Sequence, residues 1–176
     1  RSLVAAFATS LEPSLSGQQT TIETAKARYD AVSQQTIAEL SSSHALGWAS
    51  LWESDLQIGG NVSATASLRS SLYYILSSVR DDWAYGSSPG GLPSTSYHGH
   101  CFWDMETWFY PPLVVTQPSI ATAITTYRQR MVPEAHRLAT ATGYAGARFP
   151  WQSAVTGAEC SPRAYNDSLY WTKEVH

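Results

Sequence analysis

The 176-residue chain contains few charged residues and no long apolar run. Asp, Glu, Lys and Arg make up 14% of it, well below the ~25% that is usual in soluble domains. The formal net charge is −3, whereas nucleic-acid binding requires a basic surface. No apolar stretch approaches the ~20 residues of a membrane span. We therefore predict neither a nucleic-acid partner nor a membrane partner.

Cysteine is also scarce, with Cys101 and Cys160 only. Two cysteines permit one disulfide and cannot form a zinc site alone, and a small buried thiol is the simpler explanation of Cys101. The pair His98 and His100 with Asp104 has the residue types of a metal site, but hydrogen bonding and packing explain them with fewer assumptions. We predict no metal and no cofactor, and we leave the pairing of the cysteines open.

An aromatic and acidic segment, YHGHCFWDMETWFYPP at residues 97–112, is the most informative part of the sequence. Six aromatic side chains surround two imidazoles and two carboxylates there. Aromatic faces cover the apolar faces of a pyranose ring, and charged acceptors make strong hydrogen bonds to its hydroxyls. The segment therefore indicates a carbohydrate-binding site.

The pattern Gly-His-x-Phe-Trp-Asp-x-Glu at residues 99–106 resembles the signature of glycoside hydrolase family 65. That family contains acid trehalases, kojibiose and maltose phosphorylases, and glucosylgalactosyl-hydroxylysine glucosidases. A Ser-Pro-Gly-Gly-Leu stretch at 88–92 and a Phe-Pro-Trp stretch at 149–151 extend the resemblance. It covers roughly residues 48–160.

The resemblance implies a mostly α-helical fold. Family members are several times longer and contain a β-sandwich, linking helices, an (α/α)6 barrel and a small β-domain. We expect linking helices at 1–45 and the N-terminal, incomplete part of the (α/α)6 barrel at 46–176. Such a piece exposes helix faces that its neighbours should cover. We therefore expect the remaining part of the parent enzyme as a partner, either as a second chain or as a nicked polypeptide.

The spacing of apolar residues predicts where the helices lie. Residues 21–40 have apolar positions at steps of three and four, which predicts one helix, and 44–54 predicts a second. Ser63 is expected to cap a third helix. Pro118 and Pro133 are expected to begin two more, the second of which ends at Gly143.

Two segments around the motif have backbone constraints of their own. The glycines and prolines of residues 85–99 predict a loop. A helix that carries Glu106 should end by Tyr110 or restart at Pro111 and Pro112, because proline in a helix interior removes a hydrogen bond.

The resemblance implies that Asp104 binds hydroxyls of the glucose unit being transferred. A buried, unpaired carboxylate is costly, so Asp104 should meet a hydroxyl, an Arg or a backbone amide. Trp103 is either a core aromatic or a wall of the sugar site. On a regular helix Glu106 points about 200° away from Asp104, so it is either a substrate contact or a structural carboxylate.

Further candidate site residues are Trp151 and Glu159, which match family positions near the pocket rim, and Phe102 of the signature. His98 and Arg148 are candidates for the polar lining of the pocket. Arg148 alternatively pairs with a carboxylate elsewhere. Relatives often carry Glu after the Trp of the Phe-Pro-Trp stretch, whereas this chain has Gln152. An amide replaces a carboxylate as a hydroxyl partner but not as a charge, which leaves the preference for the second sugar open.

The resemblance also implies an inverting mechanism, in which a Glu general acid protonates the glycosidic oxygen while water or phosphate attacks from the opposite face. The family position of that acid lies beyond His176, so we assign no catalytic residue and expect the isolated chain to be inactive. Our first hypothesis is part of an inverting α-glucoside hydrolase that acts on trehalose or a related α-linked glucosyl disaccharide or glycan. The alternatives are a disaccharide phosphorylase of the same family and a non-catalytic sugar-binding or structural fragment.

Asn61 and Asn166 each begin an Asn-x-Ser tripeptide, the N-glycosylation sequon. With the low charge, they predict a glycoprotein that is secreted, in the cell wall, or vacuolar or lysosomal. Free phosphate is a poor co-substrate outside the cell, so this location favours a hydrolase.

Overall fold

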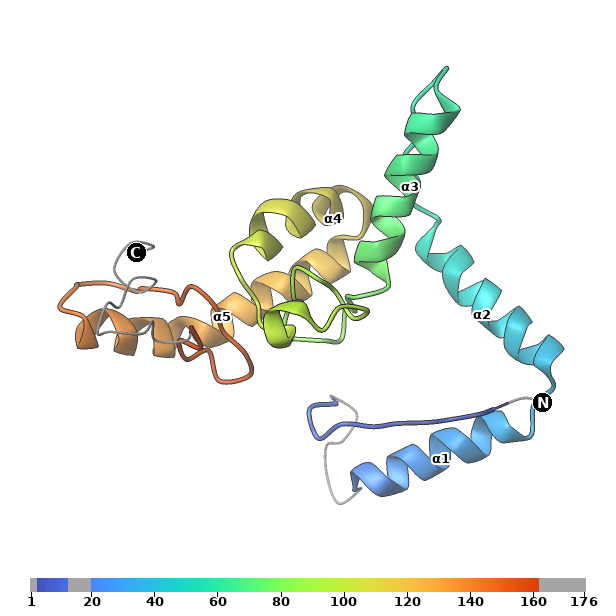
Figure 1. Cartoon of the computed structure of the whole chain (residues 1–176), viewed down its shortest axis with the longest axis horizontal. Helices are drawn as coiled ribbons and strands as arrows, with labels where there is room; N and C mark the ends of the chain where they lie inside the picture. The colour runs from blue at the N-terminus through green and yellow to red at the C-terminus, as the bar shows by residue number, and fades with distance from the viewer. Residues whose placement is uncertain (1–2, 13–19, 162–176) are drawn as a thin grey trace. The chain divides into compact units, whose positions relative to one another are not determined.

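The computed structural model describes residues 3–12 and 20–161. They form α1 (Thr21–Ser33), α2 (Ile37–Leu51), α3 (Val62–Leu76), the 3-10 helix η1 (Ser96–Gly99), the π-helix η2 (Met105–Phe109), α4 (Tyr110–Thr116) and α5 (Pro118–Ala141) (Figure 1). These described residues contain no β-strand; one isolated antiparallel bridge pairs Cys101 with Ser153. The expected helical fold class, that of an (α/α)-barrel piece, is therefore confirmed.

The chain divides into two compact units, Arg1–Ser54 and Asp55–His176. The first unit contains α1 and α2, and the second contains the remaining elements. Within the described residues, no helix is both long enough and apolar enough to cross a membrane.

The predicted single helix at 21–40 is wrong, because α1 ends at Ser33 and α2 begins at Ile37. A capping box starts α2: the Thr36 hydroxyl accepts from the Glu39 N–H at 3.2 Å, and the Glu39 carboxylate accepts from the Thr36 N–H at 2.7 Å. These reciprocal bonds satisfy two N–H groups that a helix start leaves unpaired. The segment predicted as a separate helix at 44–54 belongs to α2 as far as Leu51, where α2 ends.

Helix α3 begins two residues earlier than expected. Asn61, not Ser63, is its N-cap, and the Asn61 Oδ1 accepts from the Ala64 N–H at 2.9 Å. Asn is among the best N-cap residues, so the correction follows from ordinary capping chemistry. Leu72 and Leu76 from the predicted apolar stripe are buried.

The predicted loop at 85–99 is confirmed up to its last four residues, which form η1. Tyr97 and His98 in η1 have left-handed φ values of 63° and 53°. After η2, the helix restarts at the prolines as α4, with Pro111 and Pro112 in its first turn. Of the two outcomes expected for the helix that carries Glu106, the restart at the prolines is therefore the one observed.

Pro133 does not begin a helix, because it lies inside the 24-residue helix α5. The buried positions Tyr127, Met131 and Ala135 continue at steps of four across the proline. Packing of this face, which includes contacts with α4, keeps α5 continuous despite the hydrogen bond that proline removes. Pro118 begins α5, and Gly143 (φ 81°) lies just after its end, so both of these expectations are confirmed.

Replacing Pro133 with Ala should stabilise the fold by roughly 1–3 kcal/mol, because Ala restores an N–H donor to the Gln129 carbonyl and removes the ring clash. Urea unfolding measures the change. Pro118→Ala is the matched control and should give no such gain, since the first helical position needs no N–H bond. A loss of stability in Pro133→Ala would instead favour a helix that starts at Pro133.

Candidate functional site

A cavity of about 630 Å³ lies beside the start of η2. Its lining combines aromatic rings with one carboxylate and one guanidinium. The lining residues are Trp103, Glu106, Thr107, Arg128, Phe149, Pro150 and Trp151. The cavity therefore brings together the aromatic motif, helix α5 and the segment that follows α5.

Two indoles form the aromatic part of this cavity. The ring centroids of Trp103 and Trp151 lie 6.5 Å apart, with the rings tilted by 46°. The buried Phe102 ring meets Trp151 at 90° and 6.2 Å, an edge-to-face contact that fixes the orientation of the Trp151 indole. Trp103 is 48% exposed, which is far more than a core aromatic would be. Both indoles thus contribute to the lining of the cavity.

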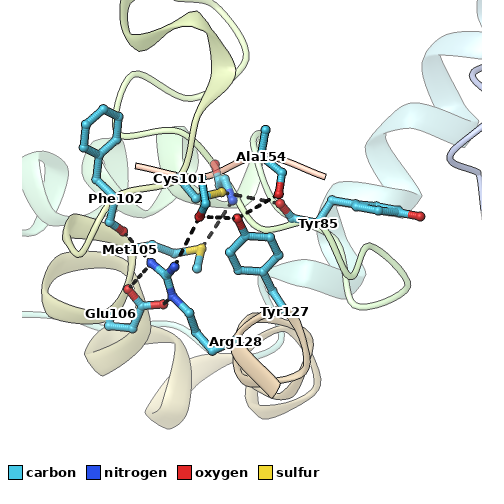
Figure 2. A network of polar contacts seen from close by, with 10 residues as sticks. Tyr85, Cys101, Phe102, Met105, Glu106, Tyr127, Arg128 and Ala154 are labelled. Carbon is cyan, nitrogen blue, oxygen red and sulfur yellow. Dashed lines mark hydrogen bonds and ion pairs between the residues drawn. The ribbon is translucent and has the colours of Figure 1, made fainter. Parts of the chain in front are cut away.

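Arg128 binds Glu106 through two parallel hydrogen bonds (Figure 2). The Arg128 Nε donates to Oε1 at 2.5 Å, and Nη2 donates to Oε2 at 2.9 Å. Nη2 also donates to the Phe102 carbonyl at 3.0 Å. Burial disfavours the Arg128 charge, but the Glu106 bonds outweigh that cost and raise the Arg128 pKa.

Arg128 is the main site residue that the sequence analysis missed. Its side chain is only 18% exposed. A signal was available, because Arg128 lies four residues after Ile124, a buried position on the apolar face of α5. A charge at that position needs a buried partner, and Glu106 supplies it.

Asp104 is half-buried and immediately precedes η2. Its carboxylate does not cap that helix and accepts no hydrogen bond from the residues that the structure describes. Asp104 does not line the 630 Å³ cavity. Of the three partners expected for Asp104, the described residues supply neither an Arg nor a backbone amide.

Residues 69–175 match the model of the glycosyl hydrolase family 65 central catalytic domain. This chain belongs to glycoside hydrolase family 65. It is 44% identical over 128 residues to a protein-glucosylgalactosylhydroxylysine glucosidase from Dictyostelium discoideum. That alignment covers 70% of this chain and 18% of the relative. It is also 41% identical over 125 residues to a kojibiose hydrolase from Flavobacterium johnsoniae, in an alignment that covers 71% of this chain and 18% of that protein.

A solved structure named "Putative kojibiose phosphorylase from human microbiome" has the same fold, with a TM-score of 0.65 and 23% sequence identity. The match covers 82% of this chain and 20% of that structure. The family 65 relatives are glycosidases or phosphorylases, and the chain spans about a fifth of their length. The family expected from the motif is therefore confirmed.

In this family 65 chain, Glu159 organises the backbone that carries Trp151. The Glu159 Oε2 accepts from the Trp151 N–H at 2.8 Å, and Oε1 accepts from the Ser161 N–H at 2.9 Å and the Ser161 hydroxyl at 2.6 Å. Glu159 does not line the cavity. The next residue after Trp151, Gln152, is buried, with its Oε1 3.3 Å from the His100 Nδ1.

His98, Arg148 and Phe102, also predicted site residues, do not line the cavity. His98 is exposed, with its ring 6.1 Å from that of His100. The Arg148 guanidinium lies over the Tyr144 ring at 5.5 Å, and its backbone N–H donates to the Ala135 carbonyl at 2.9 Å. Phe102 supports Trp151 by ring contact rather than facing the cavity.

Cys101 and Cys160 are both free thiols. Cys101 is 2% exposed, and burial raises its pKa to about 11. The described residues contain no cluster of His, Cys, Asp and Glu that is suited to a metal ion. Asn61, the predicted glycosylation site, is exposed, and Asn166 lies outside the described residues.

Alkylation of the native chain at about pH 8 should modify Cys160 and spare Cys101, because the thiolate is the reactive form and Cys101 stays protonated and buried. Mass mapping of the peptides measures both sites. Unfolding in guanidinium should make both thiols reactive. An intact mass that is lower by two hydrogens, with neither cysteine alkylated after unfolding, would indicate the disulfide instead.

Proposed function

We propose that this chain supplies the glucose-binding part of an inverting α-glucoside hydrolase. The observation that carries the proposal is the exposed Trp103 indole, 6.5 Å from the Trp151 ring at a cavity of about 630 Å³. Pyranose rings present apolar C–H faces, and an aromatic face covers them without needing hydrogen bonds. The volume suits a mono- or disaccharide.

The polar part of recognition falls to Asp104, the residue that directly follows Trp103. Its carboxylate accepts no hydrogen bond from the described protein, so a sugar hydroxyl can donate to it without displacing an internal partner. Charged acceptors make the stronger hydrogen bonds, and such bonds accelerate a reaction when they tighten in the transition state.

The proposed hydrolysis needs a general acid, and we assign none to the described residues. Glu106 is held by Arg128, and Glu159 is held by backbone N–H groups and Ser161. Their carboxylate oxygens are occupied by these internal hydrogen bonds, whereas a general acid must donate a proton to the glycosidic oxygen. Glu106 and Glu159 therefore hold the backbone around the binding site in place. We propose that the 176-residue chain binds glucosides without hydrolysing them.

An α-linked glucosyl disaccharide or glycan is the proposed substrate. The kojibiose hydrolase and the protein-glucosylgalactosylhydroxylysine glucosidase among the relatives support kojibiose-like glucosides ahead of trehalose. A phosphorylase is the second candidate, supported by the fold match named for a kojibiose phosphorylase. Phosphate-dependent release of glucose 1-phosphate, from an enzyme that contains this chain, would favour this second candidate.

We further propose a secretory or vacuolar location for the protein and a glycan on Asn61. Asn61 is exposed, and its Oδ1 caps α3, so the side-chain nitrogen that would carry a glycan is not needed for the cap. The remaining part of the parent enzyme is the proposed protein partner. Exposed apolar side chains of the second unit, such as Trp108 at 62% and Val115 at 74%, support a partner surface.

Trp103→Ala should weaken binding of kojibiose by roughly 1–3 kcal/mol, because it removes one aromatic wall. Titration of the chain, followed by NMR, measures the affinity. Trp108→Ala is the matched control: this indole is also exposed near the motif but does not line the cavity. It should leave the affinity unchanged. Unchanged affinity in Trp103→Ala together with lost thermal stability would make Trp103 a core residue.

A further inference from the structure

Arg128 contacts the segments that carry both cavity tryptophans (Figure 2). Its guanidinium donates to the Glu106 carboxylate and to the Phe102 carbonyl, and Nη1 lies 3.5 Å from the Ser153 hydroxyl. We propose that Arg128 is a positioning residue, which fixes the separation and tilt of the Trp103 and Trp151 rings without itself binding the sugar. This inference rests on the proposed function of the cavity.

The first two contacts lie on either side of Trp103 and Asp104. The Phe102 carbonyl belongs to the peptide bond that enters Trp103, and Glu106 follows three residues later, in η2. One planar guanidinium binds both, at 3.0 Å and at 2.5 to 2.9 Å. Because the donors of a guanidinium have a fixed geometry, the backbone between the two contacts is held in one orientation.

The third contact connects Arg128 to the segment of Trp151. Ser153 lies two residues after Trp151, is fully buried, and exchanges two backbone hydrogen bonds with Cys101, at 2.8 and 3.0 Å. Cys101 directly precedes Phe102, so the two tryptophan segments are joined at the point where Arg128 binds. The backbone hydrogen bonds between Cys101 and Ser153 set the register of the two segments. The bonds from Arg128 then fix the direction in which the Trp103 side chain leaves the backbone.

The platform under Arg128 is rigid. Its neighbour Tyr127 is fully buried, and the Tyr127 hydroxyl lies 2.7 Å from the Ser153 Oγ and donates to the Ala154 carbonyl at 3.2 Å. A site keeps its geometry when the residues behind it are locked by packing and hydrogen bonds. Arg128 thus lies on a part of α5 that cannot shift without breaking buried contacts.

The experiment uses the 176-residue chain labelled with 5-fluorotryptophan and followed by fluorine NMR, with the signals of its seven tryptophans assigned by Trp→Phe substitution. The variant is Arg128→Lys, which keeps the charge but loses the paired donors. The Trp103 and Trp151 signals should shift in the sugar-free protein, and the dissociation constant for kojibiose should rise roughly tenfold or more. The other tryptophan signals should stay in place.

Arg137→Lys is the matched control. Arg137 also lies on α5 and binds a carboxylate through two bonds, to Glu134 at 2.8 and 2.5 Å, but it contacts neither tryptophan segment. It should leave all signals and the affinity unchanged. If Arg128→Lys does not fold, Glu106→Gln replaces it; this variant keeps the side-chain shape and should shift the Trp103 signal.

Unmoved Trp103 and Trp151 signals in a folded Arg128→Lys protein would overturn the inference, even if sugar affinity fell, because Arg128 would then act by direct contact. Unchanged affinity alongside shifted signals would equally overturn it. Absence of sugar binding in the unsubstituted chain contradicts the proposed function instead. In that case the fluorine signals still decide whether Arg128 positions the two indoles.

Discussion

The bidentate ion pair between Arg128 and Glu106 is the interaction on which the arrangement of the site depends. The side chains of Arg128 and Glu106 are only 18% and 37% exposed. Removing their charges from water costs free energy unless each charge is paired and hydrogen-bonded. Here the pair meets that condition and adds a bond to the Phe102 carbonyl. Because the same guanidinium satisfies all of these groups, the aromatic motif and α5 are held in one relative position.

The π-helix η2 explains how the motif reaches this pair. Pi-helical turns are rare and often occur at functional sites. In this chain η2 starts directly after Asp104 and ends where Pro111 and Pro112 restart the helix as α4. The turn places Trp103, Glu106 and Thr107 on one cavity. It also buries Met105, whose sulfur accepts from the Ser87 N–H at 3.3 Å, so the loop at 85–99 is tied to the motif.

Sequence patterns predicted part of what short-range chemistry decides and missed what packing decides. The aromatic motif, the loop before it and the end of α5 shortly before Gly143 were predictable, because glycine, proline and aromatic residues have strong local preferences. The break before α2 was missed although its signal is local, since Thr36 and Glu39 form a capping box. Continuity of α5 across Pro133, the role of Arg128 and the backbone contacts of Glu159 were not, because each depends on residues that meet only in the fold.

The central claim is that a pyranose packs its apolar face against the exposed indole of Trp103. Saturation-transfer difference NMR of kojibiose with the chain tests this claim directly, because it reports which sugar protons contact the protein. The account predicts stronger transfer to the protons on one face of one glucose ring than to those on the other face. Equal transfer to both faces, or none at all, would contradict the account.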